Sequence, residues 1–291
     1  TQARRLELRD VQLVRLWWLK RHPDFQKTVT TGSRGKIGAL MVHGLGGTQF
    51  DFGNLIASLQ KAGIDTHTPL LPGHGGQPED LLGTRAEDWL ACVQAEYRRL
   101  RPLYDKLHVI GMCMGSLLCL ELAKQEKLAP GQLVLLAPPV FLDGWSLPWY
   151  RGLRYLGYWL PWVASRWRVD EEEPFGIKNE MMRKVVKSKL LKGGGFHYLW
   201  VPLYCIEQMD RLRRWVMHDL GRIDVPCLII HAREDELTSL RSAYYLQQEI
   251  GPAQVQLSVL ENSYHMVCLD NDRLELAKLV VQKLSPDAVT D

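Results

Sequence analysis

The chain of 291 residues is long for one average domain but normal for a large α/β domain with an insertion, and its 46% hydrophobic and 24% charged residues are close to the globular mean. A formal net charge of +3 is too small to indicate a nucleic-acid partner, and none is expected. No apolar run is long enough to span a bilayer and no secretory signal pattern is visible, so we expect a cytoplasmic protein.

Basic residues are concentrated at the start of the chain. Residues 1–36 form an arm with nine Lys and Arg against three acidic residues, which leaves a net charge of about −3 on the remainder. Residues 6–20 predict an amphipathic helix, because Leu13, Leu16 and Trp17 recur at i, i+3 and i+4 between arginines. One hypothesis is peripheral contact of this helix with a lipid or polymer-granule surface. The alternative is a helix that packs on the domain or on the partner in a homodimer.

From residue 36 onward, predicted strands alternate with predicted helices, which is typical of a mostly parallel central sheet with helices on both faces. The predicted strands cover residues 36–42, 64–68, 107–111, 132–137, 225–231 and 255–260. The predicted helices cover residues 50–62, 84–100, a segment that ends near 127, and segments at about 239–250 and 271–284. For helix 84–100 we expect Thr84 as the N-cap, with Glu87 at the spacing of a capping box.

The alternation stops over residues 140–220, and this interval holds seven of the ten tryptophans. Because it comes after the sixth or so strand, we expect it to form an aromatic helical cap over the carboxyl ends of the strands, where open α/β sheets bind ligands. The alternative is an ordinary helical insertion with a small core of its own. The cap separates two parts of the core, residues 37–139 and 221–291. Four aromatic side chains of the cap are candidate substrate contacts: Trp145, Trp149, Trp159 and Trp162.

The segment LHVIGMCMGSLLC, residues 107–119, carries the main chemical signal. A strand leads into Gly111-Met112-Cys113-Met114-Gly115 and then into a helix, which is the G-x-S-x-G nucleophile elbow with cysteine in place of serine. The glycines let the strand and the helix approach closely around a strained turn. The N-terminus of the helix points its dipole at the sulfur and favours the thiolate, which is the nucleophilic form. Cys113 is therefore the predicted nucleophile.

A glycine-rich loop follows the first strong strand. The sequence His43-Gly44-Leu45-Gly46-Gly47 matches the loop that supplies one N–H of an oxyanion hole. The expected donors are the backbone amides of Leu45 and of Met114, the residue after the nucleophile. We expect His43 and His74 to brace the loops around the site.

The predicted acid and base follow the last two strands. Asp235 lies four residues after His231, and we favour it as the acid over its neighbours Glu234 and Glu236. His265 follows the final strand, where its imidazole would take the thiol proton and be held by Asp235. The chain order is nucleophile, acid and base, as a nucleophile elbow of this kind requires.

These segments resemble a known family. VHGLGGTQFDFGNLIASLQKAG, HTPLLPGHGGQPEDLLGTRAEDW, HAREDELTSLRSA and YHMVCLD are similar to segments of bacterial carboxylesterases and monoacylglycerol lipases of the α/β-hydrolase superfamily. The resemblance covers roughly residues 37–137 and 225–285 and leaves out the cap. It implies an α/β-hydrolase fold and a hydrolase of small lipophilic carboxylic esters that needs no metal or cofactor.

Cys113 departs from that family, in which the nucleophile is serine. Cysteine at this position is similar to dienelactone hydrolases, polyhydroxyalkanoate synthases and some intracellular polyhydroxybutyrate depolymerases and oligomer hydrolases. The aromatic cap and the basic arm fit the polyester enzymes better than a dienelactone hydrolase. Synthases usually have Gly-Gly where this chain has Gly115-Ser116, and the chain is short for a synthase. We therefore favour hydrolysis of short hydroxyalkanoate esters, such as 3-hydroxybutyrate oligomers.

Two other functions stay open from the sequence. In the first, an alcohol or a thiol resolves the acyl-enzyme in place of water, which makes the protein an acyltransferase. In the second, the protein binds a ligand without catalysis. The complete set of Cys113, Asp235 and His265 argues against the second function, because a drifting site usually loses one member first.

Overall fold

The computed structural model describes residues 37–192, 197–251 and 254–285. The predicted arm, residues 1–36, with its amphipathic helix at 6–20, lies outside these described residues.

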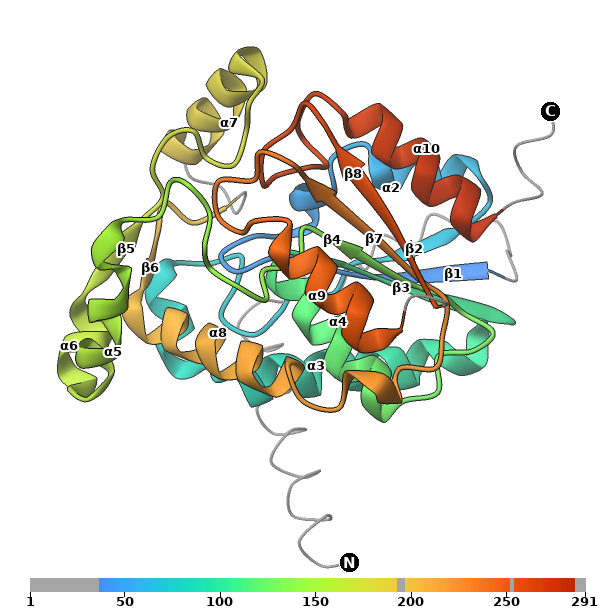
Figure 1. Cartoon of the computed structure of the whole chain (residues 1–291), viewed down its shortest axis with the longest axis horizontal. Coiled ribbons are helices and arrows are strands. Elements are labelled where there is room, and N and C mark those ends of the chain that lie inside the picture. The colour runs from blue at the N-terminus through green and yellow to red at the C-terminus, as the bar shows by residue number, and fades with distance from the viewer. Residues whose placement is uncertain (1–36, 193–196, 252–253, 286–291) are drawn as a thin grey trace, which may run out of the picture.

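A six-stranded sheet in the order β2-β1-β3-β4-β7-β8 forms the centre of the molecule (Figure 1). Every neighbouring pair in it is parallel, so the carboxyl ends of all six strands meet at one edge. The prediction of a mostly parallel central sheet is therefore confirmed. The strands are β1 (Ile37–Val42), β2 (Asp65–His67), β3 (Lys106–Met112), β4 (Leu133–Leu136), β7 (Cys227–Ala232) and β8 (Val255–Leu260).

Helices cover both faces of this sheet (Figure 1). Helices α2 (Leu55–Lys61) and α10 (Arg273–Leu284) pack on one face. On the other face lie α3 (Ala86–Leu100), α4 (Met114–Gln125) and α9 (Arg241–Ile250), with α8 (Leu203–Val216) against α4. The short 3-10 helices are η2 (Gln49–Phe52), η3 (Pro78–Gly83), η4 (Arg101–Leu103) and η6 (Leu220–Arg222). None of the helices in the described residues is both long enough and apolar enough to cross a membrane.

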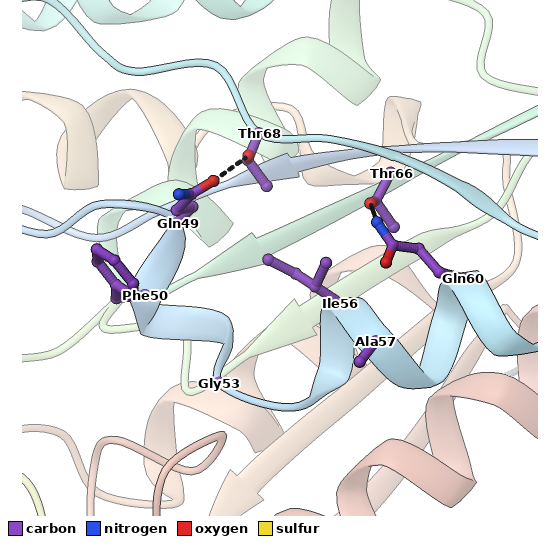
Figure 2. A pocket seen from close by; sticks show the side chains of 8 residues that line it. All are labelled: Gln49, Phe50, Gly53, Ile56, Ala57, Gln60, Thr66 and Thr68. Atoms are coloured by element: carbon purple, nitrogen blue, oxygen red, sulfur yellow. Dashed lines mark hydrogen bonds between the residues drawn. The ribbon is translucent and has the colours of Figure 1, made fainter. Parts of the chain in front are cut away.

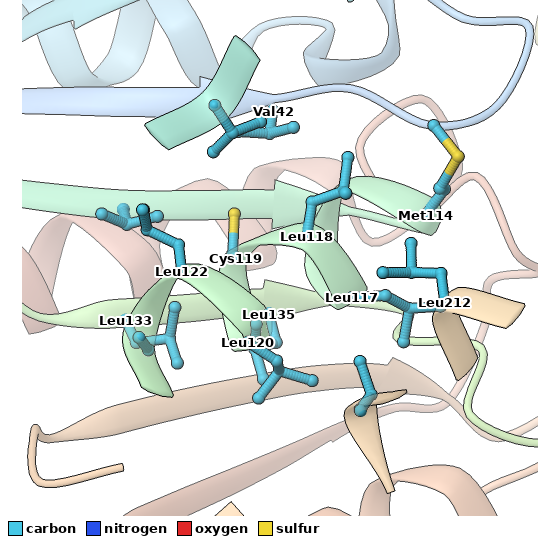
Figure 3. Packing of buried hydrophobic residues seen from close by; sticks show 14 of the residues in the cluster. Val42, Met114, Leu117, Leu118, Cys119, Leu120, Leu122, Leu133, Leu135 and Leu212 are labelled. Carbon is cyan, nitrogen blue, oxygen red and sulfur yellow. The ribbon is translucent and has the colours of Figure 1, made fainter. Parts of the chain in front are cut away.

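The core divides at the sheet because successive strand residues point to opposite faces. In β1, Leu40 and Val42 join the cluster under α3 and α4, whereas Ala39 and Met41 join the cluster under α2 and α10. Figure 3 shows the first cluster around α4, which is buried on nearly all sides. A helix buried in this way holds its N-terminus, and the residue before it, in a fixed position relative to the sheet.

Two details of the predicted helices are wrong. The predicted helix 50–62 is divided into the 3-10 turn η2 and helix α2. Helix α3 has Arg85, not Thr84, as its N-cap, and Asp88 completes the capping box by accepting a hydrogen bond from the Arg85 N–H at 2.8 Å. Thr84 is not free for this role, because it ends η3 and its hydroxyl donates to the carbonyl of Leu81 at 2.9 Å.

Strands β4 and β7 are neighbours in the sheet, but the aromatic insertion separates them in sequence. It follows the fourth strand of the described chain, and not the sixth or so as expected. Its elements before α8 lie beyond the carboxyl ends of the strands (Figure 1). They are η5 (Trp149–Leu153), α5 (Arg154–Tyr158), α6 (Pro161–Arg166), β5 (Arg168–Asp170), α7 (Glu180–Lys192) and β6 (Trp200–Pro202), of which β5 and β6 pair antiparallel.

Candidate active site

Cys113 lies on the turn between β3 and α4, with a backbone φ of 52° and ψ of −122°. A positive φ is rare for a residue with a side chain, and such backbone strain is typical of functional sites. A Cβ on Gly111 would lie 2.5 Å from the backbone of Gly115, and a Cβ on Gly115 would lie 1.9 Å from the carbonyl oxygen of Val42. Both positions of the elbow therefore require glycine, for the reason that the sequence pattern indicated.

Ser116 fixes the elbow from below, and sequence reasoning gave it no role. Its buried hydroxyl donates to the carbonyls of Gly111 at 2.8 Å and Leu136 at 3.1 Å, and it accepts from the Leu136 N–H at 3.2 Å. One side chain thus joins β3, α4 and β4 directly beneath Cys113. No pattern in the sequence marks this contact, because its partners are backbone atoms and one of them, Leu136, lies on the neighbouring strand β4.

The structure brings Asp235 and His265 together next to Cys113. The Nδ1–H of His265 donates to Oδ2 of Asp235 at 2.8 Å, and both side chains are buried. The other ring nitrogen, Nε2, is buried and makes no hydrogen bond of standard geometry within the described residues. The Cys113 sulfur is nevertheless close enough to the ring to raise the pKa of its imidazole. Catalytic hydrogen bonds are often long or poorly aligned before substrate binds.

The electrostatics of His265 result from two opposing effects. Burial alone would lower the pKa of its imidazole, but the Asp235 carboxylate and then the Cys113 sulfur outweigh burial and hold this pKa well above 6.5. A raised imidazole pKa favours the protonated form of His265, in which Nε2 carries a proton that it can donate.

The backbone of its own loop orients Asp235. Its Oδ1 accepts hydrogen bonds from the N–H groups of Leu237 and Thr238, both at 2.9 Å, and this leaves Oδ2 for the imidazole. Despite its burial, the pKa of Asp235 is lowered, because His265, then His231 and the Thr238 N–H, stabilise its charge. His231 lies 3.7 Å from Oδ2, but its Nε2 donates to the Thr238 carbonyl at 2.9 Å.

The two rival acids have other partners. Glu234 is half-exposed and pairs with Lys178 at 2.9 Å. Glu236 is buried, and its Oε2 accepts a hydrogen bond from the backbone N–H of His265 at 2.9 Å. Glu236 therefore supports the histidine through the main chain, whereas Asp235 is the carboxylate that bonds to the imidazole.

Glu236→Gln should change how stability depends on pH. Burial raises the pKa of Glu236 to about 7, from an ordinary 4.5. Between these two values the folded protein binds more protons than the unfolded chain, so this group's contribution to the unfolding free energy falls as pH rises, by at most about 3 kcal/mol. Relative to the unmodified protein, the variant's unfolding free energy should increase from pH 5 to pH 8. Urea unfolding at both pH values measures this.

The control for that measurement is Glu234→Gln, which removes a neighbouring carboxylate whose partner lies at the surface. It should leave the pH dependence of stability unchanged. If the difference between Glu236→Gln and the unmodified protein is the same at both pH values, Glu236 does not titrate as its burial indicates.

The glycine-rich loop lies against the nucleophile. A Cβ on Gly44 would lie 3.2 Å from the Cβ of Cys113, and the buried Asp51 accepts from the Gly44 N–H at 2.9 Å. Met114 is the first residue of α4, and its N–H has no hydrogen-bond partner among the residues that the structure describes, as is typical of a first helical turn. The Leu45 N–H has no hydrogen-bond partner in the described part of the chain. Met114 is the neighbour of Cys113 in sequence, and Leu45 follows Gly44, which packs against Cys113. Within the described residues both predicted oxyanion donors are therefore available to a substrate.

Hydrogen bonds to two other segments, near Leu71 and at Tyr198, fix the glycine-rich loop. His43 donates from Nδ1 to the Gly44 carbonyl at 2.8 Å and accepts from the Leu71 N–H at 3.1 Å, which agrees with the predicted bracing role. Tyr198, from the insertion, donates its backbone N–H to the Gly46 carbonyl at 2.9 Å. Its ring stacks on His74, with 6.3 Å between the ring centroids. Sequence reasoning missed Tyr198, since its partners lie more than a hundred residues away.

Tyr198→Phe should weaken the contact between the insertion and the loops of the site. The hydroxyl of Tyr198 donates to the Gly73 carbonyl at 2.8 Å and accepts from the Gly76 N–H at 3.1 Å. Its loss leaves two backbone groups without partners, which costs about 1–3 kcal/mol of unfolding free energy. Thermal unfolding measures the effect, with the exposed Tyr244→Phe as the control. Equal shifts in the two variants would contradict the assignment.

Of the four predicted aromatic contacts, only Trp145 approaches the site. Its ring meets that of Tyr264, the neighbour of His265, with 5.4 Å between centroids, and its Nε1–H donates to the Glu234 carbonyl at 3.0 Å. Trp149, Trp159 and Trp162 are exposed on the insertion. Within the described residues, no hydrogen bond or ring contact joins them to the catalytic candidates, so their role in substrate binding stays a prediction.

An open cavity of about 310 Å³ lies between η2, α2 and β2 (Figure 2). The Gln60 amide donates to Thr66 at 2.9 Å, and Thr68 donates to Gln49 at 3.4 Å. The lining has no titratable side chain and contains neither Cys113 nor His265. We assign no function to this cavity.

Comparisons with known proteins identify the family and several relatives of this chain. A model of the alpha/beta hydrolase family matches residues 39–279. The chain is 28% identical to a thermostable monoacylglycerol lipase of Bacillus sp. (strain H-257), over 82% of this chain and 86% of the relative. It is 24% identical to a carboxylesterase of Bacillus subtilis (strain 168), over 82% and 88%. A solved structure of a metagenome-derived lipolytic enzyme superposes with a TM-score of 0.74 at 25% identity, over 88% of this chain and 96% of the other.

Proposed function

Since this chain belongs to the alpha/beta hydrolase family, we propose that it hydrolyses carboxylic esters with Cys113 as the nucleophile, through a thioester acyl-enzyme. The observation that carries the proposal is the position of Cys113 on a strained elbow beside His265, whose Nδ1–H bonds to the buried Asp235 carboxylate. The lipase and the carboxylesterase among the relatives support ester hydrolysis.

In the first half of the proposed reaction, the thiolate of Cys113 attacks the carbonyl carbon of the ester. The carbonyl oxygen becomes an oxyanion and accepts hydrogen bonds from the N–H groups of Leu45 and Met114. The carbon–oxygen bond to the alcohol then breaks. The Nε2–H of His265 gives its proton to the leaving alcohol, and a thioester to Cys113 remains.

In the second half, neutral His265 takes a proton from water, and the hydroxide attacks the thioester carbonyl in the same oxyanion hole. The carbon–sulfur bond breaks, the carboxylic acid leaves, and the thiolate and imidazolium are restored. Asp235 holds the imidazole in one tautomer throughout, with Nδ1 as a donor and Nε2 facing the reacting atoms.

For the substrate, we propose a small lipophilic ester, with oligomers of 3-hydroxybutyrate as the preferred class. The relatives support a lipophilic ester. The preference for hydroxyalkanoates rests on cysteine at the nucleophile position, which resembles the polyester enzymes, and on the aromatic insertion above the strand ends. If purified protein cleaves plain acyl esters but ignores 3-hydroxybutyrate oligomers, this preference is wrong.

The experiment is hydrolysis of p-nitrophenyl esters of increasing acyl length and of 3-hydroxybutyrate oligomers, with intact-mass detection of the protein during turnover. We expect ping-pong kinetics and an acyl adduct that neutral hydroxylamine removes, as a thioester requires. A ternary-complex rate law, or turnover without an adduct on Cys113, would count against the mechanism. An added alcohol that becomes the main acyl acceptor would identify an acyltransferase.

A further inference from the structure

The insertion carries an exposed apolar surface that the proposed mechanism does not use. The described residues expose eighteen large hydrophobic side chains, and ten of them lie within residues 145–167. Apolar residues scattered singly over a surface are normal, whereas a dense patch marks an interaction site. We call this surface the aromatic patch and define it by six of its exposed members: Trp149, Leu153, Leu156, Trp159, Leu160 and Trp162.

On η5 and α5 the polar side chains face the protein and the apolar side chains face solvent, which is the reverse of an ordinary surface helix. A surface helix normally turns its apolar stripe to the core. Here Arg154 and Tyr158 face the protein, where both side chains bond to the buried carboxylate of Asp210 on α8 at 2.8 Å. The opposite face carries Leu153 and Leu156, with 59% and 67% of their surface exposed. The polar bonds therefore hold the element in place while its apolar face is turned to solvent.

The charge of the segment indicates which kind of surface it meets. Residues 144–169 contain four arginines and no Asp or Glu. Arg151 and Arg166 have no acidic partner within the described part of the chain, and Arg166 is exposed. The acidic run at 170–173 begins at the end of β5 and continues toward α7, where Glu173 pairs with Lys187. Aromatic and leucine side chains among arginines are typical of elements that lie in the interface of an anionic bilayer.

From this arrangement we propose that the aromatic patch docks the protein on the surface of an anionic phospholipid bilayer. A second copy of the chain is a poorer occupant, since contact through the same patch would bring arginines against arginines. The basic arm, residues 1–36, is disfavoured for the same reason. In Figure 1 helices α5 and α6 lie at one end of the molecule, away from α9 and α10, where a flat surface can reach them.

The segment that carries the patch also contacts the rim of the candidate active site. Trp145, at the start of the same segment, packs on Tyr264 next to His265. The patch is thus continuous in sequence with the rim of the site. The docking itself is independent of whether the protein hydrolyses esters, so its test uses binding and not turnover.

The test is cosedimentation of the full chain with phosphatidylcholine vesicles, with and without phosphatidylglycerol, at low and high salt. We expect binding to the anionic vesicles that weakens with salt, and little binding to the neutral ones. Leu153→Ser with Leu156→Ser should reduce the anionic binding about tenfold or more, because two exposed apolar side chains no longer enter the interface. Arg166→Glu should also reduce it.

Matched controls separate the patch from general changes in surface polarity. Leu103 and Leu274 are 62% and 68% exposed and lie outside the insertion, so Leu103→Ser with Leu274→Ser removes equal apolar surface elsewhere. Arg222→Glu, at an exposed position on η6, is the control for charge. Both controls should bind like the unmodified protein. All variants should keep the circular dichroism spectrum and the cooperative thermal unfolding of the unmodified protein, which checks their folding without relying on turnover.

Three results would overturn the proposal. The first is failure of the unmodified protein to bind anionic vesicles, and the second is equal binding by the patch variants and the control variants. The third is a dimer, detected by light scattering, that only the patch variants disrupt. The patch would then be a subunit interface. If vesicle binding depends on the patch but no ester is cleaved, the docking stands and the proposed function fails.

Discussion

Cys113→Ala should lower kcat/KM for the best ester by at least about 10³-fold, and no acyl adduct should form on the protein. The effect is large because the nucleophile, the imidazole and the carboxylate act as a unit, so removal of one member disables the other two. The remaining rate would come from the oxyanion donors and substrate binding alone. Steady-state kinetics together with intact-mass spectrometry measures both parts of the prediction.

Two other cysteine substitutions, Cys92→Ala and Cys113→Ser, are the controls for Cys113→Ala. Cys92 is also partly exposed and lies on α3, so Cys92→Ala should leave kcat/KM unchanged. Cys113→Ser should retain the fold and form an oxygen ester that neutral hydroxylamine does not remove. If Cys113→Ala hydrolyses the esters as well as the unmodified protein, Cys113 is not the nucleophile for them.

The sequence predicted the parts of this site that depend on short motifs. The elbow needs glycine on both sides of the nucleophile for local steric reasons, and the loop at 43–47 follows β1 directly. Strand β8 spans the same residues as predicted, because Val255, Leu257 and Val259 alternate with polar residues and the alternation ends at polar turn residues. Motifs whose geometry is set within a few residues can therefore be identified from sequence alone.

The supporting contacts were not predicted, because they join segments far apart in the chain. Asp51 holds Gly44, Glu236 holds the backbone of His265, and Tyr198 holds Gly46. Asp51 and Glu236 lie in segments that resemble the family, but neither they nor Tyr198 have a role in the elbow, oxyanion or triad patterns, and their side-chain types give no indication of their partners. Glu236 was considered only as a rival acid, since sequence cannot tell whether a carboxylate meets an imidazole or a main-chain N–H.

The insertion shows a different limit. Its aromatic composition predicts an unusual segment, but composition does not say which faces are buried. Hydrophobic periodicity is normally assigned to a core-facing stripe, and on η5 and α5 the apolar residues face solvent. The bonds of Arg154 and Tyr158 to Asp210 cause this reversal, and they connect residues more than fifty positions apart.

Gly115→Ala should destabilise the protein by at least about 3 kcal/mol and remove its activity. The added Cβ would lie 1.9 Å from the Val42 carbonyl oxygen and 2.7 Å from that of His43, both backbone atoms. Neither atom can move without displacing β1 or the glycine-rich loop, so α4 must shift away from the sheet. That shift would move the Met114 N–H together with Cys113. Urea unfolding followed by circular dichroism measures the loss of stability.

Gly83→Ala is the matched control for this change, because nothing lies within 4 Å of its added Cβ and its φ is negative. It should change the unfolding free energy by less than about 1 kcal/mol. Equal stability of Gly83→Ala and Gly115→Ala would mean that α4 can move away from β1 at little cost. The elbow would then be a flexible turn, and the strained geometry of Cys113 could not hold the sulfur in place for catalysis.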